Sequence, residues 1–343
     1  MTPKTIAIVI LNWNGKKMLE TFLPSIVHNN LKDVDIIVAD NASTDDSILF
    51  VKNIFPQIKI IQNTENGGFA KGYNDALKLV KSDYYILLNS DVEVTPNWIQ
   101  PFLEILDKHP ETVAIQPKIL SYINKTEFEY AGGAGGFIDK YGYPFCRGRI
   151  FQTIEKDEKQ YDNEQEIFWA SGACLFIKSL VFHELGGFDE DFFAHMEEID
   201  LCWRIKNAGY KIMYCPTSTV YHLGGGTLHK NNPQKTYLNF RNNLFILFKN
   251  HSSRFFYPKI IIRLTLDGIA GIKFLLEGET AHFIAVIKAH FHFYGSLKKL
   301  LEKRKITKKN TKKYATSCIY RHSVVYAYYV KKRKKFFQLD FTD

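Results

Sequence analysis

The first 120 residues alternate between strand-like and helix-like patterns, and this alternation constrains the fold more than any other feature of the sequence. Apolar runs at residues 6–11, 35–40 and 84–88 are short and end in polar turns, as buried strands do. Stretches with helical periodicity separate them, the first over residues 16–27. Such βαβ alternation predicts an α/β fold with a mostly parallel sheet and right-handed crossovers.

Charge divides the chain into two parts. Residues 251–343 carry 20 Lys and Arg against 6 Asp and Glu, a net charge of about +14. Residues 1–250 carry 25 against 30, about −5. We therefore expect a mildly acidic α/β domain over residues 1–250, followed by a basic, aromatic-rich helical tail over residues 251–343.

Three features bear on the compartment. No uncharged apolar stretch reaches the ~18 residues that a membrane-spanning helix needs. The first apolar run, residues 6–11, is too short for the core of a signal peptide. The five cysteines show no CxxC pair and no regular spacing, which is typical of free thiols. We therefore expect a protein of the reducing cytoplasm.

Polar side chains follow two of the predicted strands where they end. Asn89-Ser90-Asp91 follows residues 84–88, and ligands of open α/β sheets bind just beyond such strand ends. Asp91 and Glu93 offer the oxygen ligands that Mg²⁺ or Mn²⁺ takes together with substrate phosphates. Asp40, at the end of the second strand, could accept hydrogen bonds from a nucleotide base or ribose. Taken alone, each of these residues is explained as well or better as a turn or helix-capping residue.

A later apolar run, residues 168–177, predicts another strand with small residues at its centre. Gly172 would let a ligand approach the backbone closely, or would only pack against a neighbour. We also expect a helix over residues 197–208, with an acidic start and Gly209 after its end. Strands at 210–215 and 219–221 then lead to His222.

Five separated segments, taken together, resemble one family. They are Ile10-Leu-Asn-Trp-Asn-Gly15, Asp40-Asn-Ala-Ser-Thr-Asp45, Asn66-Gly-Gly-Phe-Ala70, Leu88-Asn-Ser-Asp91, and the run from Gly187-Phe-Asp-Glu190 to Glu197-Glu-Ile-Asp-Leu-Cys-Trp-Arg204. Over roughly residues 4–250 the chain resembles family 2 glycosyltransferases, in the branch of rhamnosyltransferase-like enzymes of bacterial surface-polysaccharide assembly. Each motif alone is weak, but five in order are specific.

The resemblance implies a GT-A fold, a nucleoside-diphosphate-sugar donor, a divalent cation (Mg²⁺ or Mn²⁺) and inversion at the anomeric carbon. It implies a metal site at Asp91 and His222, and a catalytic base at Glu198, with Glu197 as its nearest rival. The implied donor-binding residues are Asn12, Asp40, Asn66, Gly68, Asn89 and Asp91, and the candidate acceptor-binding residues are Trp169, Ser171 and Gly172.

The chain departs from the family pattern at two of these positions. Asn89 stands where the Asp-x-Asp motif has its first carboxylate, and Glu198 stands where relatives have an aspartate. Asn89 therefore supports an alternative, a catalytically weak sugar-nucleotide-binding subunit. A nucleotidyltransferase is a second alternative, but residues 12–17 make a poor triphosphate-binding loop.

The tail mixes aromatic and aliphatic residues with basic runs at 298–313 and 331–335. This pattern predicts a peripheral enzyme on the cytoplasmic face of the inner membrane, whose tail approaches an anionic surface and a glycan or lipid-linked glycan acceptor. A solvated helical face is one alternative. Nucleic-acid binding is another, which the pattern favours less. The sequence leaves homo-oligomerisation open.

Overall fold

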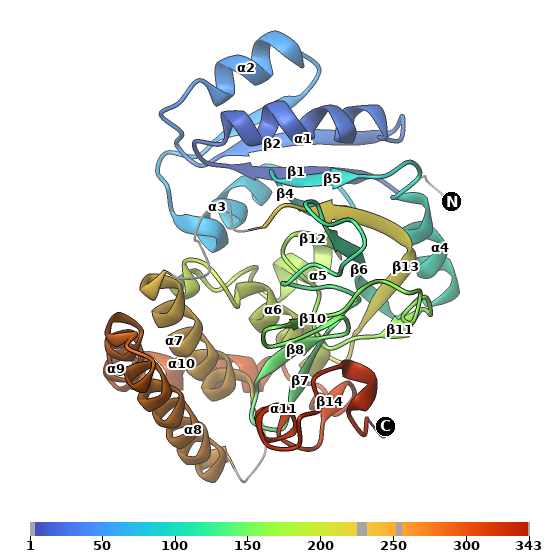
Figure 1. Ribbon diagram of the computed structural model, residues 1–343. Coiled ribbons are helices and arrows are strands. Elements are labelled where there is room, and N and C mark those ends of the chain that lie inside the picture. The colour runs from blue at the N-terminus through green and yellow to red at the C-terminus, as the bar shows by residue number, and fades with distance from the viewer. Residues whose placement is uncertain (1–3, 225–231, 252–255, 342–343) are drawn as a thin grey trace.

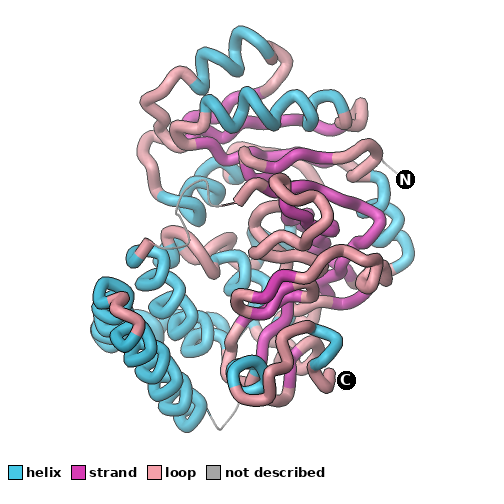
Figure 2. Tube along the Cα trace, in the orientation of Figure 1, coloured by secondary structure: helices cyan, strands magenta, loops and turns pink. Residues whose placement is uncertain are grey.

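The computed structural model describes residues 4–224, 232–251 and 256–341 of the 343-residue chain. The chain forms a nine-stranded sheet and a five-stranded sheet. Helices flank the large sheet, and the small sheet lies below it in the view shown (Figure 1, Figure 2). The expected α/β class is therefore confirmed.

The large sheet has the strand order β11-β13-β6-β12-β4-β1-β2-β3, with β5 paired to β13. Its strands are β1 (Ile6–Asn12), β2 (Val34–Asp40), β3 (Lys59–Gln62), β4 (Tyr84–Asn89), β5 (Val92–Val94), β6 (Thr112–Ser121), β11 (Gln165–Glu166), β12 (Cys174–Lys178) and β13 (Lys211–His222). Strands β3, β2, β1 and β4 are parallel, as the alternation predicts. Strand β12 is antiparallel to β4 and β6. The chain reaches it through the small sheet rather than a crossover helix, and therefore enters the large sheet from the opposite end.

Helices cover both faces of the large sheet. They are α1 (Lys16–His28), α2 (Ser47–Ile54), α3 (Gly68–Leu77), α4 (Gln100–Lys108), α5 (Ser179–Glu184) and α6 (Glu197–Asn207). Ile6, Ile8 and Ile10 of β1 belong to an apolar cluster with α1, α2 and α4. Ala7 and Val9 point to the other face, where they join a cluster with α3 and α6.

The small sheet joins the middle of the chain to its end. Its strands are β7 (Gly136–Asp139), β8 (Pro144–Cys146), β9 (Arg149–Ile150), β10 (Thr153–Ile154) and β14 (Ile319–Tyr320). Helices α7 (Pro233–Asn250), α8 (Phe256–Leu276), α9 (Thr280–Gly295) and α10 (Leu297–Asn310) form one side of the molecule, and α11 (Val324–Tyr329) lies near β14 (Figure 1). Apolar residues of the tail and of the small sheet belong to one cluster.

Two of the predicted strand regions have different bounds in the structure. Residues 168–173 precede β12 instead of extending it, because Gly136 pairs with Trp169 in an isolated bridge and Gln116 accepts a hydrogen bond from the Ser171 amide. The strands expected at 210–215 and 219–221 are one strand, β13, with an irregularity between Cys215 and Thr219.

All five cysteines are free, and four of them are buried. Of the helices in the described ranges, none is both long enough and apolar enough to cross a bilayer.

Candidate functional site

Four strands of the large sheet bring the predicted site residues to one edge. The register of β1 places Asn12 beside Asp40 of β2, and Leu11 beside Asn89 of β4. His222, the last residue of β13, pairs with Val92 directly after Asp91. Residues that are far apart in the sequence therefore meet where the parallel strands end.

The Asp40 carboxylate is held rigidly at this edge. It accepts hydrogen bonds from Asn12 Nδ2 (3.0 Å) and from the Ser43 amide (3.0 Å), and it is 1% exposed. Asn12 also donates to Ser47 Oγ at 2.9 Å and is fully buried. Asn12 therefore orients the Asp40 carboxylate and is itself shielded from solvent.

Asn66 and Gly68 form a turn that is tied to a second segment of the site. Asn66 Oδ1 accepts hydrogen bonds from Asn41 Nδ2 (2.8 Å) and from the Gly68 amide (3.0 Å). Gly68 has a φ of 78°, and a Cβ there would lie 2.6 Å from the carbonyl oxygen of Phe193. The next amide, that of Phe69, donates to this same oxygen at 2.8 Å. Position 68 therefore requires glycine for both conformation and space.

His222 lies between two carboxylates. Its Nε2 is 3.1 Å from Asp91 Oδ1, and its Nδ1 is 3.6 Å from Glu129 Oε1. Asn89 Nδ2 is 3.4 Å from Nε2 on the Asp91 side. Glu129 was not predicted from the sequence, because it belongs to an aperiodic stretch and reaches His222 only through the packing of that stretch against β6.

The charges of this cluster depend on each other. Burial alone would lower the pKa of His222, but Asp91 and Glu129 raise that pKa to about 10. Burial likewise opposes ionisation of the two carboxyl groups, yet His222 holds the pKa of Asp91 and that of Glu129 below their ordinary values. The protonated imidazole thus balances two buried carboxylates.

The donor atoms at Asp91 and His222 fit a divalent cation that is also bound by phosphate. A carboxylate oxygen and an imidazole nitrogen 3.1 Å apart can bind one ion, which would take the place of the Nε2 proton of His222. Glu129 faces the other ring nitrogen at 3.6 Å. Within the described ranges, no group of three or more His, Cys, Asp or Glu side chains is arranged to hold a metal. Diphosphate oxygens would have to complete the coordination, as is common for Mg²⁺. Glu93, by contrast, forms an ion pair with Lys125.

The acidic start of α6 lies in unusual backbone. Phe193, His195 and Met196 have φ values of 60°, 68° and 74°, conformations that non-glycine residues rarely adopt. Helix α7 holds them in place, since Asn242 Nδ2 donates to the carbonyl oxygens of Ala194 (3.0 Å) and His195 (2.7 Å). The segment before Glu197 is therefore fixed by hydrogen bonds to a different helix.

Glu197 and Glu198 differ in their surroundings. Glu197 is 4% exposed, and within the described structure its Oε2 has no hydrogen-bond partner. Glu198 is half-buried beside Gly172, where an added Cβ would lie 3.9 Å from Glu198 Cβ. Burial raises the pKa of Glu198 to about 7, and burial together with Glu198 raises the pKa of Glu197 well above its ordinary value. A carboxyl group with a pKa near 7 is suited to proton transfer.

The other two candidate acceptor residues use their polar atoms inside the protein. Ser171 Oγ donates to the carbonyl oxygen of Ala131 at 2.5 Å, and Trp169 Nε1 donates to that of Phe137 at 2.9 Å. Both side chains are 3% exposed. Of the three, only Gly172 lies beside the candidate base.

A network of ion pairs lies behind the site. Asp200 is fully buried and binds Arg204 (2.9 Å), Lys249 (2.7 Å) and Asn250 (2.7 Å), so its pair with Arg204 is not on the surface. Lys249 also binds Asp189 at 2.7 Å. The motif that runs from residue 187 to residue 204 is thereby anchored to α7.

Two lysines of α10 extend this network. Lys303 binds Asp189 and Asp191, the latter at 2.6 Å, and Lys299 binds Asp191 at 2.6 Å. From the sequence, both lysines belong to the basic run 298–313, which we expected to approach an anionic surface outside the protein. Ion pairs between residues more than 100 positions apart leave no periodic signal that could have revealed this use.

Comparison with known proteins gives a consistent result. The family model "Glycosyl transferase family 2" matches residues 7–182. The N-acetylglucosaminyl-diphospho-decaprenol L-rhamnosyltransferase of Mycobacterium tuberculosis is 26% identical over 235 residues, which cover 63% of this chain and 75% of that protein. The low-salt glycan biosynthesis hexosyltransferase Agl10 of Haloferax volcanii is 21% identical over 304 residues, covering 84% of this chain and 90% of that protein.

Two solved structures share the fold at low sequence identity. GalNAc-T7 with UDP, GalNAc and Mn²⁺ has a TM-score of 0.55 and 17% identity, with coverage of 72% of this chain and 48% of that one. The mannosyltransferase PcManGT from Pyrobaculum calidifontis with GDP-Man and Mn²⁺ has a TM-score of 0.53 and 13% identity, with coverage of 84% and 86%.

Proposed function

This chain belongs to glycosyl transferase family 2, and from that premise we propose that it is an inverting enzyme that uses a nucleoside-diphosphate sugar. It has the GT-A fold and is a glycosyltransferase. The proposal adds the donor class, the stereochemistry and the residues that perform the reaction.

The observation that carries the proposal is that Asp40 and the Asp91–His222 pair lie at the same edge of the large sheet. Asp91 and His222 would hold a divalent cation, Mg²⁺ or Mn²⁺, which when bound neutralises the charge that develops on the leaving diphosphate. Asp40 would orient the nucleotide. Glu198 would accept the proton of the acceptor hydroxyl while the hydroxyl oxygen attacks the anomeric carbon from the side opposite the diphosphate. A single displacement of this kind inverts the configuration at that carbon.

We further propose a lipid-linked glycan as acceptor, in the synthesis of cell-surface polysaccharide on the cytoplasmic face of the inner membrane. The name of the Mycobacterium tuberculosis relative specifies N-acetylglucosaminyl-diphospho-decaprenol, a lipid-linked sugar, and this supports a lipid-linked acceptor. The basic charge of residues 251–343 supports a position at an anionic membrane surface.

One residue favours a second candidate function, a sugar-nucleotide-binding subunit with weak activity. Asn89 lies 3.4 Å from His222 where the family motif has a carboxylate, and a neutral amide attracts a cation less strongly. Turnover measurements separate the two functions.

The test offers the protein a panel of nucleotide sugars in the presence of Mg²⁺ or Mn²⁺. Sugar transfer is measured by the release of nucleoside diphosphate. We expect one donor to be turned over, with the anomeric configuration of the product inverted. Donor binding without turnover would favour the weak subunit, and retention of configuration would contradict the proposed role of Glu198.

The metal site has its own test. In calorimetry, nucleoside-diphosphate affinity should increase with Mg²⁺ or Mn²⁺ for the wild type and should lose this dependence in Asp91→Ala. Asp107→Ala, an exposed aspartate on α4, is the matched control. Metal dependence that survives Asp91→Ala would show that Asp91 is not the ligand.

A further inference from the structure

The outside of the α8–α9 helix pair exposes an unusual amount of apolar surface. Helix α8 exposes Ile261, Ile269, Ile272 and Leu276, which follow one another at helical spacing along one side. Leu276 is 83% exposed, at the end of this row. A contiguous apolar face of this kind indicates a surface that another body covers.

Helix α9 continues the exposed apolar surface. Ile284, Ile287, Phe291 and Tyr294 are spaced by three or four residues, and Phe291 is 71% exposed. The opposite side of α9 buries Ala285, Val286 and Ala289 toward its helix neighbours. Both helices lie at the outer side of the molecule, away from the large sheet (Figure 1). We call the exposed apolar sides of α8 and α9 the outer face.

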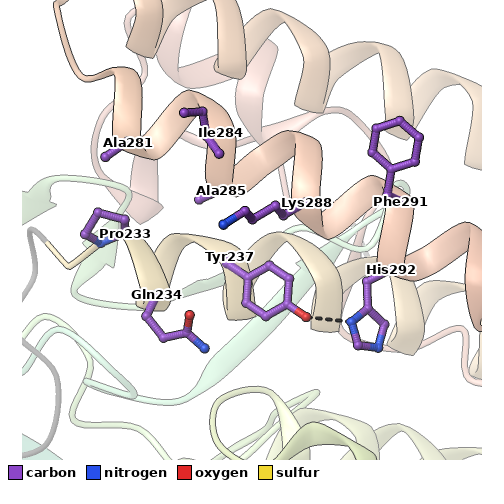
Figure 3. Close-up of a pocket in the computed structure, with 9 residues that line it drawn as sticks. All are labelled: Pro233, Gln234, Tyr237, Ala281, Ile284, Ala285, Lys288, Phe291 and His292. Carbon is purple, nitrogen blue, oxygen red and sulfur yellow. Dashed lines mark hydrogen bonds between the residues drawn. The ribbon is translucent and has the colours of Figure 1, made fainter.

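A groove of about 370 Å³ lies between α9 and α7, and Lys288 lines it. Figure 3 shows the Lys288 side chain in this groove, between Ile284 and Phe291 of α9 on one side and Tyr237 of α7 on the other. Tyr237 Oη and His292 Nδ1 form a hydrogen bond of 2.6 Å along the same groove. An amine in an apolar groove that opens beside the outer face fits a phosphate group attached to an apolar chain.

Charge determines which occupant fits. Residues 256–295, which include α8 and α9, carry 4 Lys and Arg against 3 Asp and Glu, and the net charge of about +14 belongs to the tail as a whole, residues 251–343. A second copy of the chain, joined by the same face about a twofold axis, would bring two such basic tails together. The cytoplasmic surface of a bilayer that contains anionic lipids has the opposite charge and attracts basic residues.

We propose that the outer face lies on an anionic lipid bilayer and that Lys288 contacts a lipid phosphate. The inference rests on the proposed function, since a lipid-linked acceptor resides in that bilayer. Helix α7 connects the two regions: Tyr237 lines the groove, and Asn242 holds the segment before Glu197. A bilayer at the outer face would thus place the acceptor lipid on the same side of the molecule as α7 and the base.

Flotation of the full-length protein with vesicles tests the proposal. Vesicles of phosphatidylcholine alone are compared with vesicles that also contain phosphatidylglycerol. We expect wild type to float only with the anionic vesicles, and the double variant Ile284→Glu/Phe291→Glu to partition at least tenfold less. Lys288→Gln should weaken partition about fivefold, the change expected for one lysine near an anionic surface.

Leu49→Glu is the control, because Leu49 is an apolar residue on α2 whose exposure lies between that of Ile284 and that of Phe291. It should float like wild type, and an unchanged melting temperature shows that each variant is folded. Flotation of the double variant at the wild-type level would overturn the proposal. So would a wild-type dimer in light scattering that the double variant dissociates, because the outer face would then join two copies.

Activity is measured separately, with a water-soluble acceptor and no vesicles. There the outer-face variants should match wild type. If wild type turns over no nucleotide sugar while flotation behaves as expected, the proposed function fails and the membrane surface stands. If turnover is normal and flotation fails, the proposed function stands and the membrane surface fails.

Discussion

Glu197 and Glu198 begin the same helix but are suited to different roles. Consecutive helical residues point about 100° apart, so the two side chains cannot both face the sheet edge that carries Asp40 and Asp91. Glu198 lies beside Gly172, while Glu197 points into the interior and is 4% exposed. The sequence could identify the acidic pair, but burial, which decides between its members, arises only when α6 is packed.

Glu198→Gln keeps the side-chain shape and removes proton acceptance. We expect kcat to fall by ~10²–10⁴ with donor affinity unchanged, as for a group that acts in the transition state. In wild type kcat/KM should rise as the pH increases through about 7, because only the ionised carboxylate accepts a proton and burial raises the Glu198 pKa to about 7. The variant should lack this rise. Glu198→Asp should retain measurable activity, and an active Glu198→Gln beside an inactive Glu197→Gln would assign the base to Glu197.

Glu197→Gln should stabilise the protein at alkaline pH. The pKa of Glu197 is raised in the folded state, so folding binds a proton between the ordinary pKa and the raised one, and stability falls as the pH rises through that window. The variant should therefore melt about 2 °C or more above wild type at pH 8 and show no such advantage near pH 4. Glu104→Gln, an exposed change on α4, should alter neither melting temperature. A lower melting temperature for Glu197→Gln at pH 8 would contradict the assignment.

At the scale of elements, α10 holds the segment that leads to Glu197 and Glu198. Lys303 binds Asp189 and Asp191, and Lys249 of α7 binds Asp189 and Asp200. The Gly-Phe-Asp-Glu motif was visible in the sequence, but the lysines that bind its Asp189 were not, since they lie 60 and 114 residues further along the chain. The tail therefore supports the site from behind in addition to any role at a membrane.

Lys303→Met should weaken this support. Burial opposes ionisation of Asp189, yet Lys249 and Lys303 hold its pKa below the ordinary range, so this ion pair stabilises the protein above the ordinary pKa and the stabilisation is lost as the pH falls. We expect a loss of ~1–3 kcal/mol in unfolding free energy at pH 7, and a smaller loss near pH 3.

The activity of Lys303→Met provides a second readout. Because the segment before Glu197 is displaced while Asp40 and Asp91 are not, kcat should fall and donor affinity should be retained. Lys305→Met, an exposed lysine on the same helix, is the matched control. Equal effects of the two variants would show that general basic charge, and not the ion pairs of Lys303, matters here.

At the scale of the whole molecule, local pattern predicted the βαβ half of the chain and the strand ends that carry the site. It did not predict that β12 is antiparallel, nor that residues 319–341 return to the small sheet. Strand β14 pairs with β7, and Phe336 lies 4.9 Å from Phe137 between ring centres. The direction of a strand and its pairing with distant strands depend on how the chain enters the sheet, which composition and periodicity do not encode.

This return makes the end of the chain part of the central core. We retain the proposal of a catalytic domain over residues 1–250 with a tail over residues 251–343, and expect the two to unfold together because they share one apolar cluster. Calorimetry of the full chain should therefore show a single transition. Two separate transitions would show that the tail folds independently.

Two adjacent phenylalanines allow a matched test of that coupling. Phe336 is buried among rings of the small sheet, whereas its neighbour Phe337 is 65% exposed. Phe336→Ala removes the contact with Phe137 and Phe145 and leaves a cavity, so it should cost ~3–5 kcal/mol and lower the single transition as a whole. Phe337→Ala has the same change in size and helical propensity but loses little buried area, and its transition should match wild type. If Phe336→Ala instead split the transition, or lowered it no more than Phe337→Ala, the C-terminal segment would be an appendage and not part of the core that supports the site.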